Sequence, residues 1–134
     1  AMTAHVVYEA IDPEAAATVS PAMVRLMREE IGFDGLLMTD DLSMHALKGA
    51  FETRVARAVA AGVDILLHCN GDPAEAAEVA EAAPWLAGRA AERAEAALAL
   101  RVSGTAGAGE TAGAGPDAAA LEAEFAALGR AAHA

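Results

Sequence analysis

Two adjacent carboxylates, Asp40 and Asp41, are the residues of this chain whose type and position best suit them to chemistry. They follow the apolar run Leu36 to Met38, which is typical of a buried parallel strand. In barrels of alternating strands and helices, the C-terminal end of a strand is where catalytic groups lie. A carboxylate there could act as a nucleophile, a base, a metal ligand or a hydroxyl acceptor. The position alone does not choose among these reactions.

The elements that must position this pair form three successive strand–helix units. Runs of apolar and β-branched residues predict three strands, over residues 2–8, 36–39 and 64–69. Alternation of strands and helices with right-handed crossovers gives parallel pairing. We therefore expect an α/β protein in which the loop after the second strand carries Asp40 and Asp41.

Helix start and stop signals separate these strands. Ser20 before Pro21 predicts a helix start, because serine is a favoured N-cap and proline suits the first helical position. Gly32 is then expected as a left-handed C-cap. The segment 72–75, Asp-Pro-Ala-Glu, predicts a capping box at the start of a third helix. Two further helices are expected over residues 52–61 and about 86–101.

The composition changes after Arg101. Residues 102–116 are mostly glycine, alanine, serine and threonine, which is typical of a flexible linker. Residues 117–134 contain a plausible amphipathic helix with Asp117 as its cap. The expected organisation is a folded portion over 1–101, the linker over 102–116 and a C-terminal helix and tail over 117–134.

The charge balance excludes some classes of partner. Twenty acidic against nine basic side chains give a formal net charge of −11. Nucleic acids and anionic membranes require a basic patch, so neither is expected as a partner. Cys69, the one cysteine of the chain, has no internal disulfide partner, and neither a membrane span nor an export signal is visible. We therefore expect a cytoplasmic protein.

Residues 32–44, GFDGLLMTDDLSM, resemble the nucleophile motif of family 3 glycoside hydrolases. The match is closest to the bacterial β-N-acetylhexosaminidases that recycle peptidoglycan. The resemblance covers about residues 2–101 and implies a partial (β/α)8 TIM barrel, consisting of the last three strand–helix units plus a C-terminal helix. A complete barrel needs roughly 250 residues, so the first five units are expected to lie outside this chain.

The resemblance assigns the nucleophile to Asp40, the first acidic residue after Thr39. In a retaining mechanism an ionised carboxylate forms a covalent glycosyl-enzyme intermediate. Successive side chains of an extended segment point to opposite sides, so Asp40 and Asp41 cannot both approach one sugar carbon. Asp41 is instead expected to accept backbone N–H groups in the following loop. No metal and no organic cofactor are implied.

Three further residues, His5, Met44 and Asn70, are candidates for substrate binding. His5 lies in a segment with a similar histidine in the family, but a buried histidine bonded to the backbone is an equally good interpretation. Met44 could form an apolar wall of a sugar pocket. Asn70 could bind a sugar hydroxyl, or it could hold the turn that Asn-Gly sequences favour. Cys69 is interpreted as a buried, inert thiol.

The implied substrate is a cell-wall saccharide with a terminal β-linked N-acetylglucosamine. In these hexosaminidases the general acid–base is a histidine, paired with an aspartate, on a mobile loop after an earlier strand. A sugar-binding Lys-His-Phe-Pro-Gly-His-Gly segment also lies earlier, and neither motif occurs here. General acid catalysis contributes about 10²- to 10⁴-fold, so the chain is expected to be nearly inactive alone. Restored turnover would require the missing N-terminal part of the barrel as a partner.

Two other interpretations remain. The first is another family 3 activity, such as a β-glucosidase or a phosphorylase. The second is a non-catalytic fragment that docks on a partner chain supplying the remaining strands. A metal among Asp40, Asp41, His45 and His68 has little support, because their spacing matches no compact zinc or calcium pattern.

Overall fold

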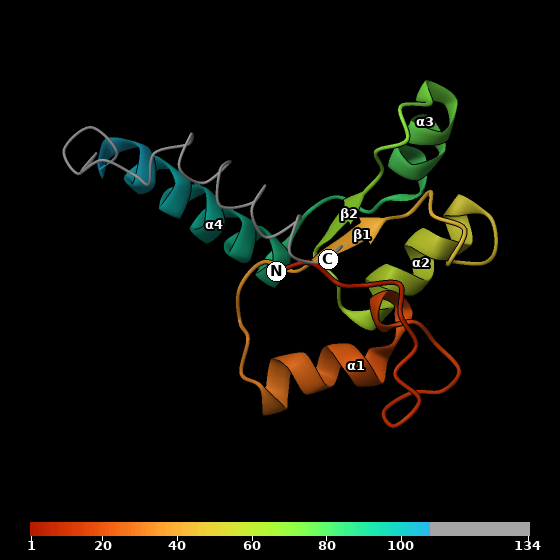
Figure 1. The fold of residues 1–134 in the computed structure, drawn as a ribbon. Helices are drawn as coiled ribbons and strands as arrows, with labels where there is room; N and C mark the ends of the chain where they lie inside the picture. The colour runs from red at the N-terminus through yellow and green to blue at the C-terminus, as the bar shows by residue number, and fades with distance from the viewer. Residues whose placement is uncertain (108–134) are drawn as a thin grey trace, which may run out of the picture. The chain divides into compact units, whose positions relative to one another are not determined.

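The computed structural model describes the backbone of residues 1–107 and the side chains of residues 1–100. Residues Ala1–Ala99 form one compact unit, and a second unit begins at Leu100. The elements follow in the order η1 (Ala17–Val19), α1 (Pro21–Arg25), η2 (Leu26–Glu30), β1 (Met38–Asp41), α2 (Phe51–Ala61), β2 (Ile65–Leu67), α3 (Pro73–Ala82) and α4 (Gly88–Gly107) (Figure 1).

Strands β1 and β2 lie side by side as a parallel pair (Figure 1). This confirms the α/β class and the parallel pairing expected from the sequence. The bounds of the strand carrying the aspartates were predicted wrongly. It begins at Met38 rather than Leu36, and both aspartates belong to it rather than to the loop. The reason is that the Leu37 N–H donates to the Asp64 side chain, 2.9 Å away, instead of joining a regular ladder.

The strand predicted over residues 2–8 was also wrong. Only an isolated parallel bridge joins Met2 to Met38. The Thr3 N–H donates to the Met38 carbonyl at 2.8 Å, so the segment lies beside β1 at that point. Farther along, the Ala17 N–H donates to the Val6 carbonyl at 2.8 Å. The segment thus leaves β1 after a few residues and turns toward η1.

The predicted helix ends are confirmed where capping chemistry is local. The Ser20 hydroxyl accepts from the Met23 N–H at 3.1 Å, with Pro21 at the first helical position. The helix continues as the π-helical η2, and Gly32 follows with a φ of 76°. Asp72 caps α3 by accepting from the Ala74 N–H at 2.8 Å.

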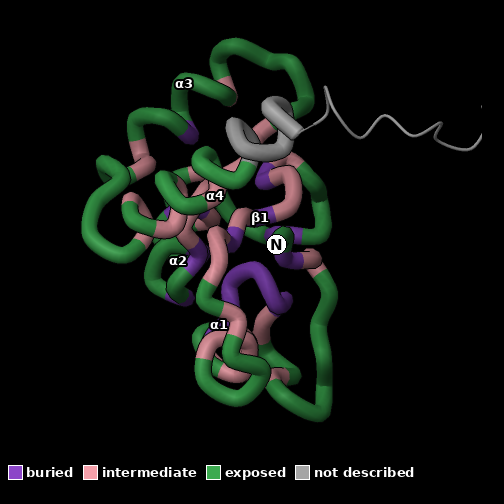
Figure 2. Tube along the Cα trace, turned by 90° about the vertical axis from the view of Figure 1, so that its left-hand side faces the viewer, coloured by how far each residue is buried: buried purple, intermediate pink, exposed green. Residues whose placement is uncertain are grey.

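The hydrophobic core is built from small and branched side chains in two clusters. Figure 2 shows buried positions on the segment that precedes α1, on β1 and on α2. One cluster joins η1, the loop after β1, α2 and α3 through Ala16, Val19, Leu42, Leu47, Val55, Ala58 and Val79. The other joins α1 to the region around both strand starts through Val24, Leu37, Ala61 and Val63.

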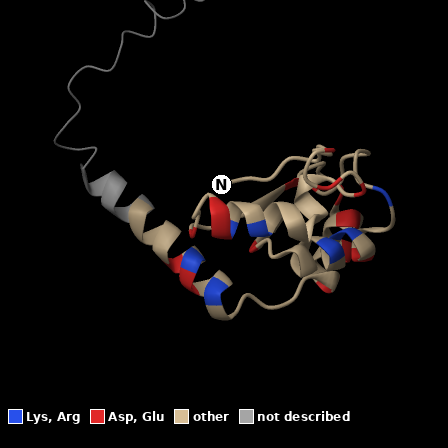
Figure 3. Cartoon of the chain, turned by 90° about the horizontal axis from the view of Figure 1, so that it is seen from below, with Lys and Arg blue, Asp and Glu red and all other residues tan. Residues whose placement is uncertain are grey.

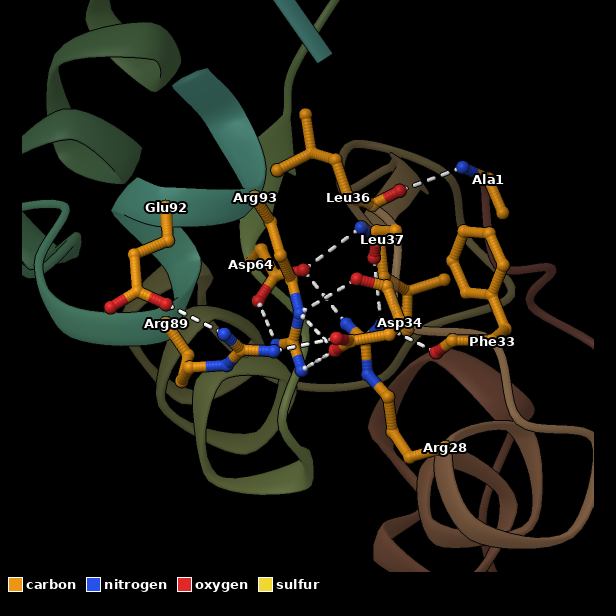
Figure 4. A network of polar contacts seen from close by, with 11 residues as sticks. Ala1, Arg28, Phe33, Asp34, Leu36, Leu37, Asp64, Arg89, Glu92 and Arg93 are labelled. Atoms are coloured by element: carbon orange, nitrogen blue, oxygen red, sulfur yellow. Dashed lines mark hydrogen bonds and ion pairs between the residues drawn. The ribbon is translucent and has the colours of Figure 1, made fainter. Parts of the chain in front are cut away.

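A polar network crosslinks the ends of β1 and β2 opposite to the aspartate pair (Figure 4). The Asp64 side chain, 4 % exposed, pairs with Arg28 at 2.8 Å and with Arg93 at 3.0 Å. Arg28 also donates to the carbonyls of Phe33 and Gly35, at 2.9 and 2.7 Å. This network therefore fastens η2 and the start of α4 to the entry of the sheet.

The rim of this network is exposed. Asp34, 64 % exposed, pairs with Arg93 at 2.8 Å and with Arg89 at 2.5 Å. The two arginine side chains lower the pKa of the Asp34 carboxyl through their hydrogen bonds. Basic and acidic residues alternate along this part of α4 (Figure 3). Ion pairs this exposed contribute little to stability compared with the buried pair at Asp64.

Helix α4 runs to Gly107, so the first six residues of the segment predicted as a linker are helical. The rest of that segment and the predicted helix over 117–134 lie outside the described residues. Within the described part of the chain, no helix has the length and apolar character required to cross a bilayer.

The polar network generates the first prediction. Asp64→Asn keeps the shape of the side chain but leaves Arg28 and Arg93 without their buried counter-charge. We expect the free energy of unfolding in urea, followed by circular dichroism, to fall by about 3 kcal/mol. The matched control Asp34→Asn removes an exposed partner of Arg93 and should cost far less. Equal losses for the two variants would contradict the importance of burial at Asp64.

Candidate active site

A β-bulge sets the direction of the two carboxylates at the end of β1. Met38 is opposite Ile65 and Asp41 is opposite Leu67, so β1 advances three residues while β2 advances two. At the bulge the hydroxyl of the fully buried Thr39 accepts the Leu67 N–H at 2.8 Å, in place of a backbone carbonyl. Bulges of this kind re-aim side chains and are common beside active sites.

Both carboxylate oxygens of Asp41 accept hydrogen bonds from the protein. Its carboxylate accepts from the Ser43 N–H at 2.9 Å, the Ser43 hydroxyl at 2.6 Å and the Cys69 N–H at 3.3 Å. Desolvation raises the pKa of this carboxyl, but the bonds from Ser43 and Cys69 outweigh it and lower the pKa from 3.8 to about 2. Asp41 thus joins the loop after β1 to the end of β2.

Asp40 has a different environment. Its Oδ1 accepts the Asp41 N–H at 2.8 Å, and the side chain is half-buried. In the described part of the chain no other hydrogen bond or ion pair to this carboxylate is present. The second oxygen of Asp40 is therefore available to a ligand, whereas both oxygens of Asp41 are engaged.

The structure places His5 against the same strand end. Its Nε2 lies 2.8 Å from the Asp41 carbonyl oxygen, and its Nδ1 lies 2.8 Å from the hydroxyl of the buried Thr18. Both ring nitrogens are thus engaged by the protein. This geometry matches the interpretation of His5 as a histidine bonded to the backbone, one of the two that the sequence left open.

Arg54 holds the loop that carries Met44. Its guanidinium donates to the carbonyls of Leu42 at 2.6 Å and Gly49 at 2.8 Å, and it stacks on the Phe51 ring at 5.3 Å. The Met44 side chain, 42 % exposed, projects from this fixed loop. The proposed role of Met44 as an apolar wall of a sugar pocket stays a prediction.

Asn70 is engaged at both ends of its amide. Its Nδ2 donates to Glu75, and its Oδ1 accepts the Asp72 N–H at 2.9 Å. Glu75 also lies 3.3 Å from Nε2 of His68, whose ring packs edge-on against Phe51 at 5.5 Å. Glu75 therefore bonds to side chains of the preceding loop rather than to the backbone N–H of the cap residue, which corrects that half of the expected capping box.

The remaining candidates of the sequence analysis add no reactive group. Cys69 is exposed rather than buried, which corrects the expectation. Desolvation and the neighbouring Asp41 carboxylate raise the pKa of its thiol, so the reactive thiolate is disfavoured. Among the described residues, no group of three or more histidine, cysteine and acidic side chains is arranged to hold a metal.

Sequence reasoning did not single out several residues that hold this site. Thr18, Thr39 and Arg54 act through partners 12 to 28 positions away in the chain, so no short motif marks them. The bond from the Ser43 N–H confirms the prediction that Asp41 accepts backbone N–H groups of the following loop. An aspartate two residues before a serine is a common turn pattern with such a contact.

Comparison with known proteins identifies the family to which this chain is similar. Residues 1–102 match the family described as Glycosyl hydrolase family 3 N terminal domain. A protein named Beta-hexosaminidase from Nitrosomonas eutropha is 40% identical over 86 residues, which are 63% of this chain and 24% of that protein. The chain thus spans about a quarter of the length of such relatives.

The chain is also similar to parts of solved structures. The crystal structure of a β-N-acetylhexosaminidase from Beutenbergia cavernae is 39% identical, with a TM-score of 0.51, and the match covers 60% of this chain and 25% of that one. CbsA from Thermotoga neapolitana is 27% identical, with a TM-score of 0.60, and covers 74% of this chain and 24% of its own. Because the family match extends over most of its length, the chain belongs to glycosyl hydrolase family 3 and carries sequence of that family's N-terminal domain.

Proposed function

We propose that this chain is the nucleophile-bearing part of a retaining β-N-acetylhexosaminidase and that Asp40 is the nucleophile. The observation that supports this role is the carboxylate of Asp40, presented at the end of β1 with one oxygen held and the other without a protein partner among the described residues. Its neighbour Asp41 is committed to the loop. The relatives named Beta-hexosaminidase support the class of reaction.

The proposed reaction has two steps. In the first step the unbonded oxygen of Asp40 attacks the anomeric carbon, and the glycosidic bond breaks as the leaving oxygen takes a proton from a general acid. In the second step a water molecule attacks the anomeric carbon and displaces the Asp40 carboxylate. The water's proton goes to the group that served as general acid in the first step and now acts as base. The hydrogen bond from the Asp41 N–H stabilises the ionised carboxylate in both steps.

We propose a terminal β-linked N-acetylglucosamine of a peptidoglycan fragment as the substrate, in the cytoplasm. Met44 is exposed on the loop after β1, where it would form an apolar wall for the sugar ring. Asn70 would act chiefly by keeping the loop after β2 in place, since both ends of its amide are engaged there. His5 would act on Asp40 through the protein rather than on the sugar.

We further propose that the three units are the last part of a TIM barrel and need the remaining part as a partner. Strand β2 pairs only with β1 among the described residues, so its other edge is open. A cavity of about 530 Å³ is lined in part by Leu66 of β2, by Leu86 and by Trp85, the last 96 % exposed. An open parallel edge beside apolar surface is favourable for strand addition.

The completed enzyme provides the test of the nucleophile. When the chain is combined with a polypeptide carrying the remaining barrel, Asp40→Ala should reduce turnover of an aryl N-acetylglucosaminide by orders of magnitude without unfolding the chain. A mechanism-based fluorosugar should label Asp40, as mass spectrometry would show. Labelling of another side chain would refute the assignment. Faster release of glucose than of N-acetylglucosamine would favour the β-glucosidase alternative.

The requirement for a partner is tested by gel filtration and turnover together. The chain alone should turn over substrate at least about 10²-fold more slowly than the combined polypeptides, because it lacks the general acid. The two polypeptides should elute together, and Trp85→Asp should weaken that association. Full turnover by the isolated chain would show that no partner is needed.

The role of Asp41 is tested through pH. The folded state favours the ionised form of Asp41, because its pKa is lowered from 3.8 to about 2. This contribution to stability is present above pH 3.8 and is lost as the pH falls toward 2. Asp41→Asn should therefore be less stable than the wild type at pH 7, and the difference in unfolding free energy should shrink over that interval. Glu81→Gln, on the exposed surface of α3, controls for the loss of one charge.

A further inference from the structure

We infer that His5 is a positioning residue that orients Asp40 through the backbone of Asp41, an inference that rests on the proposed role of Asp40. The imidazole lies between two fixed groups. Its Nε2 is 2.8 Å from the Asp41 carbonyl oxygen, and its Nδ1 is 2.8 Å from the Thr18 hydroxyl. The Thr18 hydroxyl lies in turn 2.8 Å from that of Thr3.

These contacts specify where the protons lie. A carbonyl oxygen only accepts, so Nε2 of His5 must carry a proton to bond Asp41. In the neutral ring Nδ1 is then the acceptor, and Thr18 donates to it. Thr18 accepts in turn from Thr3. Thr18 is fully buried and Thr3 is 6 % exposed, which shields this chain of bonds from water. The Asp41 carbonyl thus selects the tautomer of His5, and the two threonine hydroxyls complete the chain of bonds behind the ring.

The effect on Asp40 is transmitted by one residue. The Asp41 carbonyl accepts from His5 and, at 3.1 Å, from the Met44 N–H, so both of its lone pairs are used. The N–H of the same residue donates to Oδ1 of Asp40 at 2.8 Å. The bulge in β1 interrupts the regular ladder at this point. Holding the Asp41 carbonyl therefore fixes the N–H that orients the Asp40 carboxylate.

Two substitutions of the same residue separate positioning from general packing. In His5→Gln the side-chain amide extends far enough to place an N–H near the position of Nε2, so the bond to the Asp41 carbonyl is kept. In His5→Asn the amide ends near the position of Nδ1 and reaches only toward Thr18. Both variants are polar and lack the ring, so they differ chiefly in the bond that the inference requires.

The experiment is nuclear magnetic resonance of the full 134-residue chain. Imidazole nitrogen shifts should show the Nε2–H tautomer of His5. Hydrogen exchange of the Asp41 amide should be about tenfold faster in His5→Asn and near the wild-type rate in His5→Gln, consistent with the loss of one hydrogen bond. The Val55 amide in α2 serves as the internal reference for overall stability. An Nδ1–H tautomer, or equal Asp41 exchange in the two variants, would overturn the inference.

Should His5→Asn fail to fold, Thr18→Val tests the same point with an almost identical shape. The loss of the hydrogen bond to Nδ1 should free one side of the ring and should speed Asp41 exchange, while the Nε2–H tautomer persists because the Asp41 carbonyl only accepts. Unchanged Asp41 exchange would overturn the inference. These readouts need no glycosidase activity, so they stand or fall independently of the reaction. In the completed enzyme, His5→Asn should lower kcat with little change in KM.

Discussion

The buried carboxylate of Asp64 holds the starts of the two strands together, and the arrangement of the sheet depends on it. It accepts from the Leu37 N–H at 2.9 Å, while the backbone N–H groups of Asp64 and Ile65 donate to the Leu37 carbonyl at 2.8 and 3.1 Å. This two-way contact fixes the entry of β1 against the entry of β2. Arg28 and Arg93 neutralise the charge, and without them an ionised group only 4 % exposed would be strongly unfavourable. The pairing of β1 with β2, including the bulge and the positions of both aspartates, begins directly after this contact.

The two ends of the short sheet thus have different roles, one in stability and one in the proposed chemistry. The end that begins at Leu37 and Asp64 is crosslinked by charge, and the end at Asp41 and Leu67 carries the candidate chemistry. This division is the one expected for parallel barrels, in which the N-terminal ends of the strands serve stability and the C-terminal ends serve function. The core between them is made of alanine, valine and leucine, so polar crosslinks matter more here than in a core rich in aromatic residues.

What the sequence could and could not predict follows from the range of the interactions. Helix starts at Ser20 and Asp72 were predictable because each cap bonds an N–H two or three residues away. Strand bounds were not, since a strand is defined by its neighbour. The backbone of residues 2–8 pairs with β1 only near Met2 and then turns to η1. The carboxylate pair could be recognised from the residue pattern. The contacts of His5 could not, because its partners Thr18 and Asp41 lie 13 and 36 positions away in the chain.

The contacts around the pair also give a physical reason why two adjacent carboxylates need not share one role. A nucleophile needs an ionised carboxylate with a free oxygen, whereas a loop anchor needs one whose oxygens are all engaged. Asp41 accepts three hydrogen bonds, which favour its ionised form but leave both oxygens engaged. Its N–H then holds one oxygen of Asp40 and leaves the other oxygen without a partner in the described chain. Asp41 therefore positions the carboxylate that we propose as the nucleophile. Exchanging the two roles would require breaking the contacts from Ser43 and Cys69 that hold the loops after β1 and β2 together.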